Sequence, residues 1–162
     1  MKNNQGFTLL ELLIAATIIG SLAVLATISY RSSAAESYVA SAKAQTEMLA
    51  GAVQRFKLEN RVTTNSPGKI EEVEDSTEAC GANTLSAANL IYCGFVENSG
   101  WNSPYFEFYI CSGTSKPCGG APSSIGTPLA FMKSKGNARM PAQYGDKYKY
   151  WVGTLGQAET RS

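Results

Sequence analysis

The side chains of this chain that could do chemistry are four cysteines and one carboxylate set among apolar residues. The 162-residue sequence has no histidine, which excludes a Ser-His-Asp or Cys-His catalytic unit and a His-ligated metal site within it. It also has no phosphate-cradling glycine motif and no G-x-S-x-G turn. We therefore expect a protein that is not an enzyme, holds no metal and uses no cofactor.

The isolated carboxylate is Glu11, the only charged side chain between Phe7 and Tyr30. As a helix rising about 1.5 Å per residue, this segment could cross a hydrocarbon core of about 30 Å, and it is too long for the apolar part of an ordinary secretory signal peptide. A carboxylate inside a membrane costs about 2.5–3.5 kcal/mol to insert. Glu11 is therefore either functional or close enough to the helix start to reach the headgroups, where it also suits the helix dipole.

The run Gly6-Phe7-Thr8-Leu9-Leu10-Glu11, followed by an apolar helix, resembles the N-terminal signature of type IV prepilins and pseudopilins. The resemblance implies that a prepilin peptidase cleaves between Gly6 and Phe7 and methylates the new N-terminus at Phe7. It also implies that Glu11 pairs with the N-terminal amine of a neighbouring subunit, which fits the need of a buried carboxylate for a cation. Many members carry a helix-kinking proline where this chain has Ile28, so whether the helix melts locally in a filament stays open.

The same resemblance divides the chain into a leader peptide (1–6), a hydrophobic transmembrane and assembly helix (7–30) and a globular pilin head (31–162). It implies a single-pass precursor in the inner membrane, with the head on the periplasmic or extracellular side, and then an extracellular filament. The implied partners are other pilin subunits in a homo- or hetero-polymer, the prepilin peptidase and the assembly platform in the inner membrane.

Beyond the apolar segment, helical spacing of apolar residues predicts that the helix continues to about Leu58 as an amphipathic helix. We expect its apolar face to carry Tyr38, Ala42, Leu49, Val53 and Phe56. β-prone runs predict strands at 89–96, 105–111, 128–132 and 147–152. The predicted fold is therefore α+β, with one long helix packed on a four-stranded antiparallel sheet. This is also the pilin fold that the resemblance implies.

All four cysteines, Cys80, Cys93, Cys111 and Cys118, lie in the predicted head. An even number of cysteines in an exported segment predicts two disulfides, of which three connectivities exist. We prefer Cys80–Cys93 with Cys111–Cys118, because each pair closes a short loop. A zinc site is disfavoured because these spacings lack close C-x₂₋₄-C pairs, and four buried thiols are the remaining alternative.

Charge is segregated in the head, although the whole chain carries a net charge of only +1. Seven acidic residues and no Lys or Arg lie between Glu71 and Glu107, whereas seven basic and two acidic residues lie between Lys116 and Arg161. The two stretches could be ordinary solvated faces or complementary contacts in a polymer. A further alternative is DNA binding by Lys147, Lys149 and Trp151, which strand alternation would place on one face.

The leading hypothesis is a structural subunit of a type IV pilus or a related filament. The first alternative is a pseudopilin of a type II secretion system. Members of the major pseudopilin group often bind calcium and lack disulfides, and the acidic residues at 71–78 offer oxygen ligands without the usual calcium-loop spacing. The second alternative is a minor pilin that acts as an adhesin or a DNA-uptake receptor, with a surface ligand or DNA as its partner.

Overall fold

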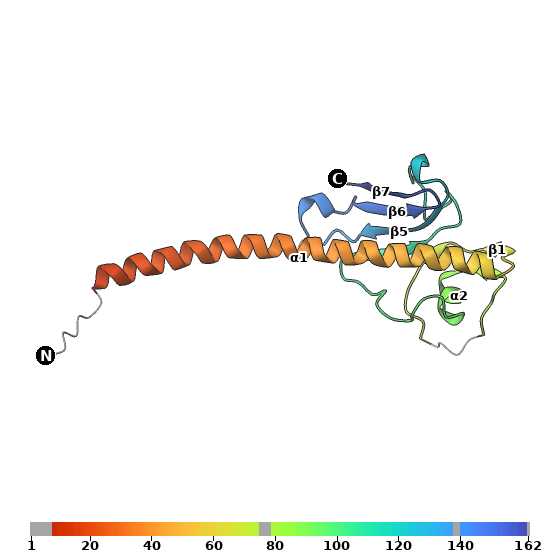
Figure 1. Ribbon diagram of the computed structural model, residues 1–162, viewed down its shortest axis with the longest axis horizontal. Coiled ribbons are helices and arrows are strands. Elements are labelled where there is room, and N and C mark those ends of the chain that lie inside the picture. Colours follow the sequence, from red (N-terminus) through yellow and green to blue (C-terminus); the bar gives the residue numbers. More distant parts are fainter. Residues whose placement is uncertain (1–7, 75–78, 138–139, 162) are drawn as a thin grey trace. The chain divides into compact units, whose positions relative to one another are not determined.

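The computed structural model describes residues 8–74, 79–137 and 140–161. Its contacts divide the chain into two compact units, Met1–Ser37 and Tyr38–Ser162, which are described separately. One α-helix, α1 (Leu9–Glu59), contributes residues to both units (Figure 1). The architecture is α+β with a long N-terminal helix and an antiparallel sheet, as the sequence predicted.

In the second unit, α1 is amphipathic, and its buried side chains match the predicted stripe. Leu49, Val53 and Phe56 are fully buried, whereas Tyr38 is only half covered and stacks at 4.8 Å on Tyr105. The helix ends at Glu59, one residue beyond the predicted end. Asn60 then turns back, with its backbone N–H and its side-chain amide both donating to the carbonyl of Phe56.

The main sheet has five strands in the order β2-β4-β5-β6-β7, with every neighbouring pair antiparallel. Their bounds are β2 (Gly68–Lys69), β4 (Phe106–Ile110), β5 (Pro128–Ser134), β6 (Lys149–Gly153) and β7 (Gln157–Thr160). The predicted count of four was wrong because it omitted both edge strands. β2 has two residues and β7 reads Gln-Ala-Glu-Thr, so neither shows the apolar alternation that indicates a strand.

The predicted strand at 89–96 is also wrong, because this segment contains the short helix α2 (Ala87–Tyr92). Ser86 caps that helix: its side-chain oxygen accepts from the backbone N–H of Asn89 at 3.1 Å. Leu90 and Ile91 are the buried residues of this helix. A short apolar run suits a buried strand and a buried helical turn equally well, and the cap decides between them.

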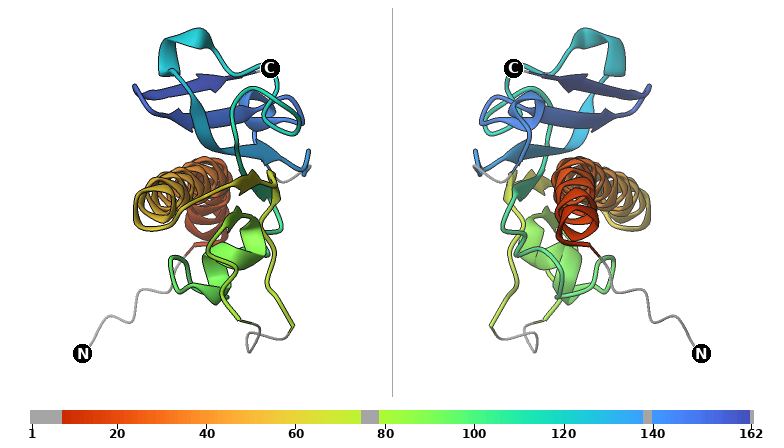
Figure 2. Two further views of the ribbon diagram at one scale, coloured as in Figure 1. Left: turned by 90° about the vertical axis from the view of Figure 1, so that its right-hand side faces the viewer. Right: turned by 90° about the vertical axis from the view of Figure 1, so that its left-hand side faces the viewer.

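The remaining elements are small. β1 (Thr64–Asn65) pairs in parallel with β3 (Thr84–Leu85), and 3-10 turns occupy Ser123–Ile125 and Ala142–Tyr144. In the second unit, α1 lies between the main sheet and α2, as both views of Figure 2 show. The head therefore has three layers, with the amphipathic part of α1 in the middle.

The two faces of the sheet have separate cores because side chains alternate between them. Phe106, Phe108 and Ile110 of β4 are buried on the face toward α1, the face they share with Tyr150, whose hydroxyl donates to Glu47 of α1. On the opposite face, Phe131 and Trp151 pack with Ile125, Cys111 and Cys118. Tyr109, Phe131 and Trp151 form one cross-strand row there, because Tyr109 is opposite Phe131 and Phe131 is opposite Trp151.

Candidate processing and assembly site

Thr8 and Glu11 form a reciprocal cap at the start of α1. The Thr8 backbone N–H and hydroxyl both donate to Glu11 Oε2 at 3.0 Å. In return, the Glu11 N–H donates to Thr8 Oγ1 at 3.3 Å. This is a capping box, in which the first residue before the helix and the third residue within it satisfy each other's polar groups.

The cap fixes where the helix begins relative to the predicted cleavage point. The helix starts at Leu9, two residues after Phe7, while Gly6 and Phe7 lie outside the described residues. The carboxylate of Glu11 is exposed, and no Lys or Arg of the described chain forms an ion pair with it. Among the described residues, the Glu11 carboxylate therefore has no cationic partner.

Behind the cap, the first unit exposes a nearly continuous apolar surface. The exposed fractions of its large apolar side chains run from 49% at Ile14 to 83% at Leu9. One 18-residue window of α1 has a mean hydropathy of 2.3, and none of it is buried. In water such a surface would be costly, since each buried apolar side chain is worth about 1.5–3 kcal/mol. By length and composition, this helix is a candidate membrane span.

Three hydroxyls within this apolar stretch are bonded to the helix itself. Thr17 and Ser21 donate to the carbonyls three residues earlier, and Thr27 donates to the carbonyl four residues earlier, at 2.7–2.8 Å. Side chains satisfied in this way do not need water, so they are compatible with a hydrocarbon environment.

Both predicted disulfides are present. Cys80 is bonded to Cys93, and Cys111 is bonded to Cys118, as the preferred pairing predicted. The first bond ties the exposed segment at Cys80 to the end of α2, whereas both sulfurs of the second belong to fully buried residues. The head is therefore crosslinked once near its surface and once in the core behind the sheet.

The three residues singled out for DNA binding are not equivalent in the structure. Trp151 is 2% exposed and packs in the core against the Cys111–Cys118 bond, so its ring is not free to stack on a base. Lys147 is exposed and precedes β6, whereas Lys149 is half-buried within it. Period-two alternation places side chains on one face of a strand but does not reveal that a disulfide loop covers part of that face.

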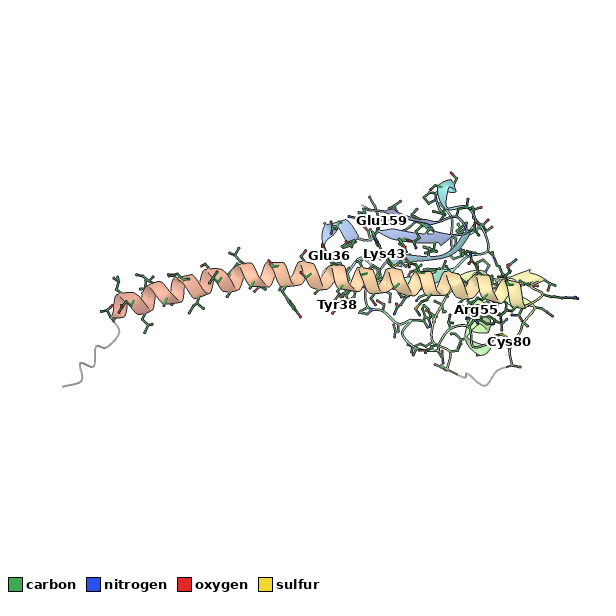
Figure 3. All side chains as sticks on the ribbon, viewed as in Figure 1. Glu36, Tyr38, Lys43, Arg55, Cys80 and Glu159 are labelled. Carbon is green, nitrogen blue, oxygen red and sulfur yellow. A yellow bond between two sulfur atoms is a disulfide. The ribbon has the colours of Figure 1, made fainter. Side chains whose placement is uncertain are left out.

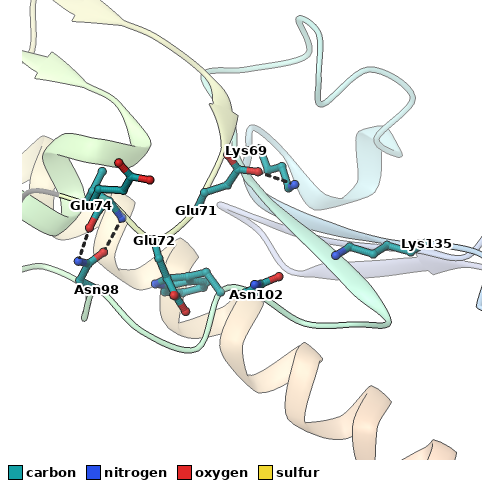
Figure 4. A pocket seen from close by; sticks show the side chains of 9 residues that line it. Lys69, Glu71, Glu72, Glu74, Asn98, Asn102 and Lys135 are labelled. Atoms are coloured by element: carbon teal, nitrogen blue, oxygen red, sulfur yellow. Dashed lines mark hydrogen bonds and ion pairs between the residues drawn. The ribbon is translucent and has the colours of Figure 1, made fainter.

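The acidic segment borders a groove of about 480 Å³ in the second unit (Figure 4). Its lining includes Glu71, Glu72 and Glu74 together with Lys69 and Lys135, so opposite charges share it. Lys69 Nζ pairs with Glu71 at 2.6 Å, and Glu72 accepts from the Gly100 N–H. Among the described residues, no three His, Cys, Asp or Glu side chains are grouped as a metal site would require; Asp75 and Glu78 lie outside them.

One ion-pair network fastens β7 to α1 inside the second unit (Figure 3). Lys43 Nζ lies 2.6 Å from Glu159 Oε2, and Arg161 lies 2.6 Å from Glu159 Oε1. Tyr148 adds a hydroxyl donor at 3.2 Å. These donors, Lys43 first, lower the pKa of Glu159 to about 2. The network was not predicted, because Lys43 and Glu159 are 116 residues apart and no local pattern links them.

Comparison with known proteins bears on the N-terminus. Residues 1–27 match the family model described as the prokaryotic N-terminal methylation motif. The N-terminus is a type IV pilin-like class III signal peptide. No curated protein and no solved structure matches the chain.

The motif at residues 1–27 and the apolar helix together bear on how the chain is processed and anchored. The motif makes it a type IV pilin-like substrate of a prepilin peptidase, and the apolar helix fits a membrane-anchored precursor. The motif also indicates assembly with other pilin subunits. The capping box was missed at first, although Thr8-x-x-Glu11 before an apolar run is its sequence signal.

Proposed function

We propose that the chain is a structural subunit of a type IV pilus or a related filament, and that it acts by polymerising rather than by catalysis. The observation that carries this proposal is the combination of the methylation motif with an apolar helical segment that is not buried among the described residues. An exposed apolar surface of this size needs either lipid or other protein. In the membrane-anchored precursor, lipid covers this surface. In the filament, other copies of the same helix cover it.

In this proposal Glu11 governs the transfer between the two environments. Cleavage between Gly6 and Phe7 creates an α-amine, which the Glu11 carboxylate of a neighbouring subunit can bind. Among the described residues, the carboxylate is held by the capping hydrogen bonds from Thr8. The attraction between the two charges grows out of water because the surrounding dielectric is low, and it offsets the cost of removing both charges from water.

The two disulfides support a pilus over a secretion pseudopilus, since a head crosslinked twice can stay folded outside the cell. Thermal melting of the full chain in detergent, with and without calcium, tests this choice. We expect no calcium-dependent rise in melting temperature, and a rise of several degrees would favour the pseudopilin.

Mass spectrometry of the N-terminal peptide from sheared filaments tests the proposal itself. We expect the peptide to begin at Phe7 and to carry one extra methyl group on its amine. Filament protein that still begins at Met1 would contradict both the processing and the assembly mechanism.

A further inference from the structure

The outer face of the main sheet, which points away from α1, ends in an accessible aromatic ring. In the row Tyr109–Phe131–Trp151, the latter two are covered, with exposed fractions of 3% and 2%. Tyr109 is half-buried and stacks on Phe131 at 4.8 Å with an angle of 16° between the rings. Tyr109 also lines a mostly apolar groove of about 750 Å³ with Lys116 and Pro117.

Lysines surround this ring. Lys69 is the cross-strand partner of Tyr109 on β2, and the Lys133 Nζ lies 5.2 Å from the centre of the Tyr109 ring. Lys116 reaches the same groove from the loop closed by Cys111 and Cys118. Three lysines on three different segments are therefore neighbours of Tyr109 or of its groove.

A fourth lysine extends this basic surface across the sheet. Lys133 and Lys149 are directly opposite each other on β5 and β6, an arrangement of like charges that destabilises a sheet. Glu107 lies 2.9 Å from Lys133 and 3.4 Å from Lys69. In the part of the chain that the structure describes, no carboxylate forms an ion pair with Lys149.

The charges of this surface do not balance. Among the described residues, its lysines are Lys69, Lys116, Lys133 and Lys149, and the acids paired with them are Glu71 and Glu107. Two positive charges are therefore in excess, although the whole chain carries a net charge of only +1. An anionic partner would relieve the repulsion between Lys133 and Lys149.

We propose that this face binds single-stranded DNA, with phosphates on the lysines and a base against Tyr109. Proteins that bind single strands combine a positively charged groove with aromatic rings on which bases stack. A duplex keeps its bases stacked inside and could not use the Tyr109 groove, while an acidic protein segment offers no base. This site replaces Trp151 of the sequence hypothesis with Tyr109 and goes beyond the role of a filament subunit.

The test is the binding of a fluorescently labelled oligothymidylate to the full chain in detergent micelles, followed by anisotropy over a series of salt concentrations. For contacts with a single strand, the logarithm of affinity should fall with the logarithm of salt by about 0.7 per phosphate contacted. The double variant Lys116→Gln/Lys149→Gln should lower that slope by about 1.4 and weaken binding at least tenfold at low salt. Tyr109→Leu keeps an apolar side chain but removes the ring, and it should weaken binding roughly tenfold.

Arg55→Gln is the matched control, because Arg55 is an exposed cation on α1 (Figure 3), and α1 lies on the other side of the sheet. It should change the affinity less than twofold, and circular dichroism should show that every variant is folded. Affinity that is unchanged in folded Tyr109→Leu, or an equal loss in Arg55→Gln, would overturn the proposal. Tighter binding of duplex DNA or heparin than of oligothymidylate would overturn it as well. None of these results depends on whether the chain forms filaments.

Discussion

The two halves of α1 face opposite requirements although they belong to one uninterrupted helix. In the first unit, Leu12 and Leu22 are 65% and 60% exposed, whereas Leu49 in the second unit is fully buried. The second half meets its apolar partners within its own chain, in the layers formed by the sheet and α2. Among the residues that the structure describes, the apolar side chains of the first half are exposed. The difference shows that, among the described residues, only the second half of α1 buries its apolar side chains.

The reason for this difference is visible in the order of polar residues. Between Leu9 and Tyr30 the only charged side chain is Glu11, so apolar residues surround the helix on all sides. From Lys43 onward, charged residues recur on one side of the helix, which is the pattern of a helix that packs on a protein core. A helix that is apolar all round requires burial from every direction, as lipid or a bundle of copies provides.

The largest expected effect comes from changing the charge in the apolar half. Glu11→Val should abolish incorporation into filaments, because the N-terminal amine of the neighbouring subunit loses its partner out of water. The fraction of subunit in sheared filaments, measured by immunoblot against the membrane fraction, checks this. Glu36→Gln is the control: it removes an exposed acid from the same helix and should leave filaments intact. Normal filaments from Glu11→Val would remove Glu11 from the mechanism.

The second prediction compares how much one leucine in each half of α1 contributes to the stability of the head. Leu49→Ala should lower the free energy of unfolding of the head by about 2–5 kcal/mol, since it leaves a cavity at a fully buried site. Leu22→Ala should change it by less than about 0.5 kcal/mol. Denaturant titration of both variants in detergent measures the difference. Equal losses would show that the first half also packs on the head.

Much of this contrast could be read from the sequence, and the exceptions have physical causes. The apolar segment, the amphipathic stripe and both disulfide pairs were predicted correctly, because each depends on local spacing or on composition. α2 was predicted as a strand because Leu90 and Ile91 suit either state. β2 and β7 were missed because edge strands of polar residues show little periodicity. The burial of Trp151 depends on a disulfide loop folding over the sheet, and no pattern around Trp151 reveals that loop.

A third effect compares the two crosslinks of the head. Replacing Cys111 and Cys118 together by alanine should destabilise the head by about 2–4 kcal/mol, because the bond and its packing against Trp151 are both lost. The same change at Cys80 and Cys93 should cost less, since Cys80 is exposed and little packing goes with it. Thermal unfolding of the two double variants ranks them. The reverse order would mean that loop closure outweighs core packing here.

The smallest expected effect is the pH dependence of the stability that the Lys43–Glu159 ion pair gives to the contact between β7 and the second half of α1. Because the folded pKa of Glu159 is lowered to about 2 from an ordinary value of 4.5, its contribution is present above pH 4.5 and is lost as pH falls toward 2. We expect this contribution to be about 1 kcal/mol, given partial exposure to solvent. Glu159→Gln should remove it and flatten the stability profile between pH 5 and pH 2. Glu59→Gln, which breaks an exposed pair with Arg55, should leave the profile unchanged within about 0.5 kcal/mol.

The central claim is that neighbouring copies cover the first half of α1 in the filament, and labelling of Leu22→Cys tests it most directly. The described chain has no free cysteine, so a water-soluble maleimide would report on the new thiol alone, and Leu155→Cys on the exposed hairpin serves as the accessible reference. We predict that Leu22→Cys stays unlabelled in purified filaments and reacts only after they are dissociated and denatured. Reaction of Leu22→Cys in intact filaments at the rate seen after dissociation would contradict the account.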